Sequence, residues 1–274
     1  AMFRSKAKRG GSYQYYEFGM ESEILRKVEL ENELRHALND NQLELHYQPQ
    51  INLHDNQIRG FEALIRWHHP VRGLISPGEF IPLAEECGLI GKLGEWVLAR
   101  VCAQLREWRN AGMPVFPVSV NVAYSQLISG DLPNFIQSTL ADAGLPADLL
   151  RLEFTETSLI DTQENAIAQM NRLTILGVSL EIDDFGTGYS SLSYLKYLPA
   201  DIMKIDRSFI NDMLVDEASA AIVAGIISMA HKIGLLVVAE GVETQEQLGL
   251  LRTQGCDIVQ GYYISRALPV RELQ

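Results

Sequence analysis

The chain has 274 residues, of which 47% are apolar, and its 23 lysines and arginines against 35 aspartates and glutamates give a formal net charge of −12. This length suits one large domain or two small ones, and the apolar fraction excludes a disordered chain. The acidity argues against a binder of nucleic-acid polymers or anionic membranes, because both need a basic protein face.

Cysteine usage and hydropathy suggest a cellular location. Cys87, Cys102 and Cys256 are odd in number and widely spaced, which indicates neither a disulfide framework nor a zinc knuckle and fits a reducing cytoplasm. The longest nearly apolar stretch, residues 218–230, is too short to span a bilayer. The basic start AMFRSKAKRG lacks the apolar region of a signal peptide. We therefore expect a cytoplasmic segment with no membrane span of its own, although a longer parent protein could be tethered to a membrane.

In chain order, residues 1–18 are basic and aromatic, unlike the acidic remainder. Apolar residues at helical spacing then predict a connecting helix over residues 19–40, ending at Asn39-Asp40. From residue 41 onward, β-rich runs alternate with amphipathic segments. The predicted strands are 43–53, 58–67, 116–122, 149–156, 178–184, 201–206, 235–240 and 258–264. The predicted helices are 77–110, 132–143, 163–176, 216–233 and 245–254.

Repeated strand–helix units predict right-handed crossovers and a mainly parallel sheet. Five glycines follow the predicted helices, where a left-handed residue commonly ends a helix: Gly112, Gly144, Gly177, Gly234 and Gly255. Eight strands in about 225 residues favour an α/β fold of the TIM-like (β/α)8 type. Residues 54–57 are too few to hold a crossover helix, so we expect a hairpin and an antiparallel first strand.

Polar side chains recur on the predicted strands, most of them at or near the strand ends. They are Glu62, Asn121, Glu153, Asp183, Asp184, Lys204, Glu240 and Gln260. In a (β/α)8 barrel the parallel strands open on one face, the face that carries active sites. Carboxylates that converge there would repel one another, and a divalent cation would relieve the repulsion. A ligand set of oxygens without His or Cys favours Mg²⁺ or Mn²⁺ over zinc.

The adjacent pair Asp183-Asp184 could serve two metals, with one carboxylate bridging them. Two metals about 3.5–4 Å apart suit in-line phosphoryl chemistry. Lys204 should keep its charge among these acids, and could orient or help deprotonate an attacking water. A different interpretation is an enolase-type barrel with Lys204 as the base that abstracts a proton. It explains neither the aspartate pair nor Arg66, whose guanidinium suits a phosphate.

These residues lie in a series of blocks that resembles one family. Glu62-Ala63-Leu64, continued as Ile65-Arg66-Trp67, resembles the signature of EAL domains, which hydrolyse the bacterial messenger cyclic di-GMP. The resemblance extends from about residue 41 to the end. Its other blocks are YQPQ, SVNV, LEFTET, IDDFGTGYSSLSYL, KIDRSFI, AEGVET and QGYYISRALP.

The resemblance implies a role for each matching residue. It makes Glu62, Asn121, Glu153 and Asp183 ligands of one metal, and Asp183, Asp184 and Glu240 ligands of a second. Lys204 would hold or activate the nucleophilic water, and Glu243 and Gln260 would fix a metal-bound water. The implied contacts to cyclic di-GMP are Gln48, Leu64, Arg66, Tyr262 and Pro269. The segment 184–191 resembles a loop that links the site to a dimer interface, and Glu156 resembles its anchor.

The implied reaction is hydrolysis of one phosphodiester bond of cyclic di-GMP to linear pGpG, with two Mg²⁺ or Mn²⁺ ions. A catalytically silent receptor of cyclic di-GMP that signals through its dimer interface is the alternative. Residues 1–18, which begin Ala1-Met2-Phe3-Arg4-Ser5-Lys6 and include Tyr13, resemble the end of a GGDEF domain. This second resemblance implies a longer parent protein with upstream GGDEF and sensor domains, of which residues 41–274 form the EAL phosphodiesterase domain. The resemblance to EAL domains implies a homodimer.

Glu181 departs from the family pattern, in which a small residue is usual. Strand alternation places it on the same face as Asp183, inside the barrel. Because a lone buried carboxylate is costly, it needs a partner. Arg151, two residues before Glu153 on the neighbouring strand, has the same orientation. We therefore predict that Arg151 and Glu181 pair inside the barrel, below the metals.

Overall fold

The computed structural model describes residues 20–159, 164–188 and 195–273. Its strands are β1 (Leu43–Asn52), β2 (Ile58–His69), β3 (Gly73–Ile75), β4 (Val118–Asn121), β5 (Leu150–Thr155), β6 (Ser179–Phe185), β7 (Ile202–Ile205), β8 (Leu236–Ala239), β9 (Ile258–Val259) and β10 (Leu268–Pro269). Its helices are α2 (Met20–Ala37), α3 (Pro77–Glu86), α4 (Ile90–Asn110), α5 (Tyr124–Ser129), α6 (Leu132–Ala143), α7 (Glu156–Leu159), α8 (Glu164–Leu176), α10 (Arg207–Asp212), α11 (Glu217–Lys232) and α12 (Gln245–Thr253).

Eight of these strands close into a barrel. Their hydrogen-bonded order is β1-β9-β8-β7-β6-β5-β4-β2, and β1 also pairs with β2. Six neighbouring pairs are parallel, namely β2–β4, β4–β5, β5–β6, β6–β7, β7–β8 and β8–β9. Strand β1 runs antiparallel to β9. The predicted (β/α)8 barrel with an antiparallel first strand is therefore confirmed.

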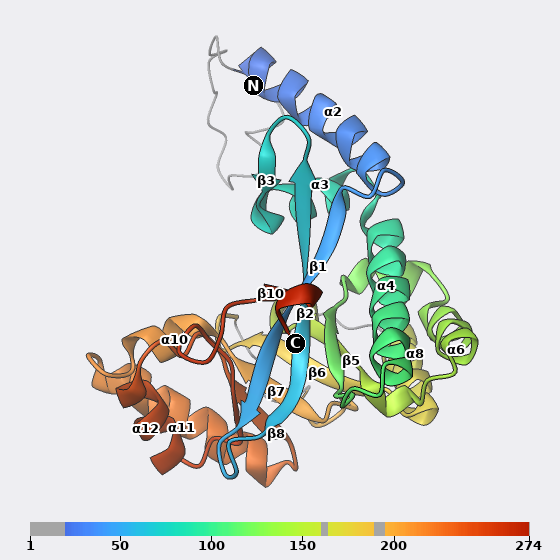
Figure 1. Ribbon diagram of the computed structural model, residues 1–274. Helices are drawn as coiled ribbons and strands as arrows, with labels where there is room; N and C mark the ends of the chain where they lie inside the picture. Colours follow the sequence, from blue (N-terminus) through green and yellow to red (C-terminus); the bar gives the residue numbers. More distant parts are fainter. Residues whose placement is uncertain (1–19, 160–163, 189–194, 274) are drawn as a thin grey trace. The chain divides into compact units, whose positions relative to one another are not determined.

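The described residues form two compact units. The first comprises residues 20–43 and 67–89, and the second comprises the described residues within 44–66 and 90–273. In the second unit the strand residues that face away from the barrel axis join one large apolar cluster with the helices. Figure 1 shows α4, α6 and α8 on one flank of these strands and α10, α11 and α12 on another. The inward-facing residues are then left to build the interior of the barrel.

The first unit contains α2, β3 and α3 with the end of β2. Trp67 is fully buried there and packs edge-on against Phe80, with ring centroids 5.6 Å apart. Helix α2 contributes the buried side chains of Leu30, Leu34 and Ala37. Within this unit the helix is therefore packed along one side.

The helix ends agree with the sequence, since Gly112, Gly144, Gly177, Gly234 and Gly255 all have positive φ angles. One predicted helix is wrong: residues 77–110 form two helices, because the chain turns at Cys87–Leu89, where Gly88 has a φ of +72°. The predicted strand 258–264 is also wrong, since β9 ends at Val259. The chain turns after it, with the N–H groups of Ile264 and Ser265 donating to the carbonyl of Gly261. Gly261 lies against the backbone of Val242, which leaves no room for a Cβ.

Several short elements were not predicted, namely β3, β10, α5, α7 and α10. The expected remnant at residues 1–18 lies outside the described residues. Across the part of the chain that the structure describes, no helix is both long enough and apolar enough to cross a bilayer.

Candidate active site

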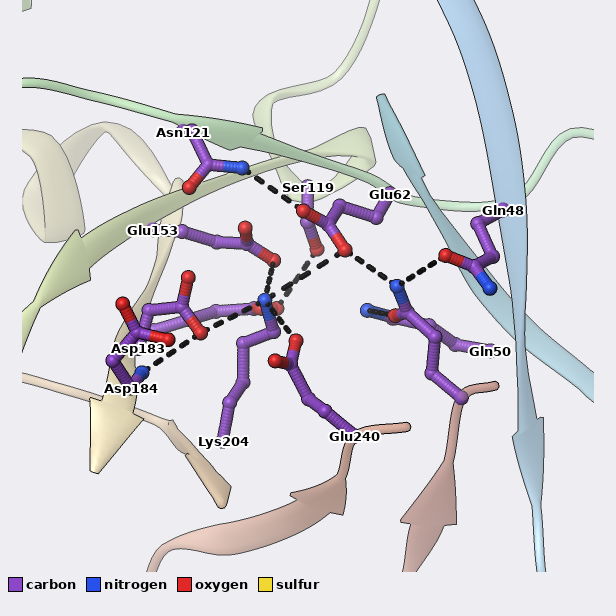
Figure 2. Close-up of polar contacts among 12 residues, drawn as sticks. Gln48, Gln50, Glu62, Ser119, Asn121, Glu153, Asp183, Asp184, Lys204 and Glu240 are labelled. Carbon is purple, nitrogen blue, oxygen red and sulfur yellow. Dashed lines mark hydrogen bonds and ion pairs between the residues drawn. The ribbon is translucent and has the colours of Figure 1, made fainter. Parts of the chain in front are cut away.

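Lys204 on β7 is fully buried at the centre of a group of carboxylates (Figure 2). Its Nζ atom lies 2.7 Å from Glu240 Oε1, 3.0 Å from Glu153 Oε1, 3.1 Å from Asp183 Oδ1 and 3.8 Å from Glu62 Oε2. These acids come from β2, β5, β6 and the residue after β8, so the closed barrel brings together side chains that are far apart in sequence. The structure thus gathers the acids expected at the strand ends around the predicted lysine.

The cluster holds more negative charge than one lysine can balance. Burial lowers the pKa of Lys204, but Asp183, Glu153, Glu240 and Glu62 outweigh it and keep that pKa well above its ordinary value. Burial, followed by the charge of Glu62, raises the pKa of Glu153 well above its ordinary value. Both carboxylate oxygens of Glu153 are buried, and Oε1 faces the Lys204 ammonium, which three other acids share. A buried carboxylate that shares one cation with three other acids is only partly compensated.

Asp183 and Asp184 lie at an irregularity of β6. The register with β7 shifts between Ile182 and Phe185, and Asp184 has a φ of +54°. In a regular strand these neighbours would point to opposite faces, but a bulge re-aims one of them. Carboxylate oxygens of Asp183, Asp184 and Glu240 consequently lie within 4.8 Å of one another. Positive φ is uncommon for a residue other than glycine, although aspartate and asparagine adopt it more readily than most.

Burial and the nearby charge of Asp183 raise the pKa of Asp184 to about 6. Burial raises the pKa of Glu240 to about 8, although Lys204 acts in the opposite direction. Oxygen ligands of this kind fit hard divalent cations such as Mg²⁺ or Mn²⁺. The partly compensated carboxylate of Glu153 and the close approach of Asp183, Asp184 and Glu240 therefore suit such ions.

Glu62 on β2 is held by amide donors on both carboxylate oxygens (Figure 2). Asn121 Nδ2 donates to Oε1 over 2.9 Å, and Gln260 Nε2 donates to Oε2. The same Gln260 nitrogen donates to Gln48 Oε1 over 3.2 Å, and Gln48 Nε2 donates to the carbonyl of Ser265 over 3.0 Å. The predicted residues Gln48, Asn121 and Gln260 thus form one hydrogen-bonded group with Glu62.

A second polar group lies inside the barrel. Arg151 Nη1 and Glu181 Oε1 are 3.6 Å apart, which confirms the predicted pair, and Ser119 Oγ donates to Glu181 Oε1 over 3.1 Å. Gln50 accepts from Arg151 over 3.3 Å and donates to Gln260 over 3.1 Å. Gln50 and Ser119 were not predicted from the sequence. Strand alternation could have found them, because they lie two residues from Gln48 and Asn121.

The expected substrate contacts lie on other elements. Leu64 and Arg66 on β2 are partly buried, and burial lowers the pKa of Arg66, whose nearest charges include Glu62. Tyr262 is 56% exposed, and the Arg266 guanidinium lies 4.1 Å from the centre of its ring. Pro269 is buried on β10, opposite His46 of β1. Among these four residues, Tyr262 is the one with an aromatic ring, and that ring is accessible.

Two further predicted residues lie next to loops. The side chain of Glu243 is exposed, and its backbone N–H donates to Gln247 Oε1 over 2.7 Å. Glu156 is fully buried, and its Oε2 accepts from the Gly186 N–H over 2.7 Å. Glu156 therefore contacts the start of the segment 184–191, whose residues 189–191 lie outside the described part of the chain.

Comparisons with known proteins point to one family. The family model described as "EAL domain" matches residues 31–267. Over 274 residues, 100% of this chain, it is 46% identical to the "Cyclic di-GMP phosphodiesterase NbdA" of Pseudomonas aeruginosa, and this match covers 35% of that protein. It is 40% identical to the "Bifunctional diguanylate cyclase/cyclic di-GMP phosphodiesterase MucR" of the same species, over 100% of this chain and 40% of that protein.

The chain thus spans about a third to two fifths of these curated relatives. Among solved structures, "PaMucR Phosphodiesterase, c-di-GMP complex" is similar with a TM-score of 0.86 and 42% identity, over 90% of this chain and 100% of that one. Because the family model covers most of the residues, the Glu-Ala-Leu block on β2 included, this barrel with its lysine inside a ring of acids belongs to the EAL domain family.

Proposed function

We propose that this chain is a phosphodiesterase that hydrolyses cyclic di-GMP to linear pGpG with two Mg²⁺ or Mn²⁺ ions. The observation that carries the proposal is the bulge of β6, which brings Asp183 and Asp184 to the same group of acids around Lys204. Relatives named as cyclic di-GMP phosphodiesterases support the substrate.

Glu62, Asn121, Glu153 and Asp183 would hold one cation, and Asp183, Asp184 and Glu240 the second. The burial of the Glu153 carboxylate, which shares the Lys204 ammonium with three other acids, supports this assignment. When bound, two such ions neutralise charge on the phosphoryl oxygens and lower the pKa of a water molecule.

The chain's own residues would position the reactants. Lys204, held among acids from several strands, presents an ammonium group that can orient the attacking water. Arg66 suits a phosphate of the substrate, because its planar guanidinium offers two parallel donors. Gln48 and Leu64 would contact the dinucleotide, and Tyr262 and Pro269 a guanine. Glu243 and Gln260 would hold a water at the site.

The test is incubation of the chain with cyclic di-GMP and either Mg²⁺ or Mn²⁺, followed by chromatographic separation of the products. We expect pGpG, and an activity loss of about 10²–10⁴-fold in Glu62→Ala and Lys204→Ala. Glu95→Ala on the exposed surface of α4 is the matched control and should keep full activity. Circular dichroism should show that all three variants fold.

A catalytically silent receptor is the second candidate. The position of Lys204 favours it, since the ammonium contacts several acids that would otherwise hold a cation. Binding of cyclic di-GMP without pGpG in the presence of either ion would establish this function and overturn the enzymatic one.

The wider organisation is also part of the proposal. Residues 41–274 would form the phosphodiesterase domain, 19–40 a connecting helix and 1–18 the end of a GGDEF domain in a longer, homodimeric parent protein with an upstream sensor. The name of MucR, which includes a diguanylate cyclase, supports this arrangement. The three unpaired cysteines, Cys87, Cys102 and Cys256, suit a cytoplasmic location.

A further inference from the structure

A chain of hydrogen bonds connects the Arg151–Glu181 pair to Glu62. Arg151 Nη1 donates to Gln50 Oε1, Gln50 Nε2 donates to Gln260 Oε1, and Gln260 Nε2 donates to Glu62 Oε2 and to Gln48 Oε1. Gln50 is fully buried, and Gln260 and Arg151 are 4% and 7% exposed. The hydrogen bonds of this group are therefore made within the protein.

The direction of these bonds follows from the chemistry at the Arg151 end. An arginine side chain has donors only, so Gln50 must turn its carbonyl oxygen toward Arg151. Its amide nitrogen then faces Gln260 and requires an acceptor there. Gln260 in turn presents its own nitrogen to Glu62 and Gln48. The side-chain amides of Gln50, Gln260 and Gln48 therefore each have one favourable orientation as long as Arg151 stays in place.

The surroundings keep Arg151 in place. Glu181 pairs with it, and the carbonyl of Arg59 accepts from Nη2 over 3.3 Å. At Gly60 a Cβ atom would lie 3.2 Å from Arg151 Nη1 and 3.3 Å from Gln50 Oε1. Any larger residue at position 60 would therefore crowd the contact between Arg151 and Gln50.

We propose that Arg151, through Gln50, is a positioning residue that fixes the amide of Gln260 as a donor to Glu62 and Gln48. The inference rests on the proposed function, in which Glu62 holds a cation and Gln48 contacts the substrate. Asn121 donates to Glu62 Oε1, and Gln260 donates to the other oxygen, Oε2. Because Gln48 Oε1 accepts from Gln260, the Gln48 nitrogen is oriented to donate to the carbonyl of Ser265. A mere charge-balancing pair would not depend on the orientation of Gln50.

The variant Gln50→Glu tests this orientation. A carboxylate at position 50 still accepts from Arg151, but it cannot donate to Gln260. Gln260 would then turn its nitrogen toward position 50 and its oxygen toward Glu62 and Gln48, where oxygens would face oxygens. The added negative charge alone would strengthen cation binding, so the two effects have opposite signs.

The measurement is calorimetric titration of Mn²⁺ into the protein without substrate. We expect Gln50→Glu to weaken Mn²⁺ binding about tenfold, in line with the effect of residues that orient metal ligands. Gln50→Met, which removes the connection and adds no charge, should weaken it less. Gln57→Glu, at an exposed position of the β1–β2 loop, is the matched control for added charge and should bind Mn²⁺ like the unchanged protein.

Equal or tighter Mn²⁺ binding by Gln50→Glu would overturn the positioning role while leaving the proposed function intact. Failure of the unchanged chain to bind Mn²⁺ would overturn the proposed function and this inference together. With cyclic di-GMP we further expect Gln50→Glu to raise KM as well as to lower kcat, because Gln48 loses its orientation.

Discussion

The two faces of β5 bury side chains of opposite character. Leu150, Leu152 and Phe154 are at most 1% exposed and belong to the apolar cluster between barrel and helices. Arg151 and Glu153 alternate with them and are buried inside the barrel, where they meet Glu181 and Lys204. One strand thus supplies the packing that stabilises the fold and the charges that compose the site.

The outer face of β5 stabilises the fold, whereas the charged inner face destabilises it. Burying an apolar side chain such as Leu152 stabilises the fold by about 1.5–3 kcal/mol. Burying Glu153 costs free energy, because its carboxylate loses water, its neighbours include other acids, and it shares the Lys204 ammonium with them. The free energy gained by burying the outer face therefore offsets the cost of burying charges in the interior. Such a compensation is common between a scaffold and its functional site.

The largest expected effect on stability falls on the outer face. Leu152→Ala should lower the free energy of unfolding by about 2–5 kcal/mol, because it leaves a cavity in a close-packed cluster. Urea denaturation measures this, and activity per folded molecule should be unchanged. Ile175→Ala is the control, since that side chain is 84% exposed. A loss of kcat in Leu152→Ala would mean that the two faces are not independent.

A substitution at Glu153, the next residue along β5, should change the stability in the opposite direction. Glu153→Gln removes a buried charge, so the metal-free protein should gain about 1–2 kcal/mol of stability. Calorimetry should at the same time show Mn²⁺ binding weaker by about ten- to a hundredfold. The exposed Glu107→Gln serves as control and should change neither. A destabilised Glu153→Gln would indicate that its attraction to Lys204 exceeds the cost of its burial.

The last effect is a pH dependence of stability that arises inside the barrel. The pKa values of Asp184 and Glu240 are raised to about 6 and about 8, so the folded state binds these protons more tightly than the unfolded state. The metal-free protein should therefore lose stability as the pH rises through the range from about 4 to about 8.

Thermal melts across this range, with and without Mn²⁺, measure the effect. Cations compete with protons for the same oxygens, so Mn²⁺ should raise the melting temperature more at the alkaline end. A metal-free melting temperature that rises with pH through this window would contradict the raised pKa values.

Much of this arrangement was predictable from the sequence, because it depends on local periodicity. Alternation along the strands placed Arg151 and Glu181 on the inner face, and the structure pairs them. The short connection after the first predicted strand indicated its antiparallel direction. The break at Gly88 was not predictable in this way, since amphipathic spacing continues on both sides of it.

The sequence by itself determined the barrel, its alternating faces and the set of acids that the strands carry. Only the tertiary structure decided how those acids meet. The bulge that turns Asp184 toward Glu240, and the orientation of Gln50 between Arg151 and Gln260, depend on neighbours that are distant along the chain. The physical reason is that the face of the sheet to which a side chain points depends on its position within its own strand. The residues that this side chain contacts depend on how the whole sheet closes into a barrel.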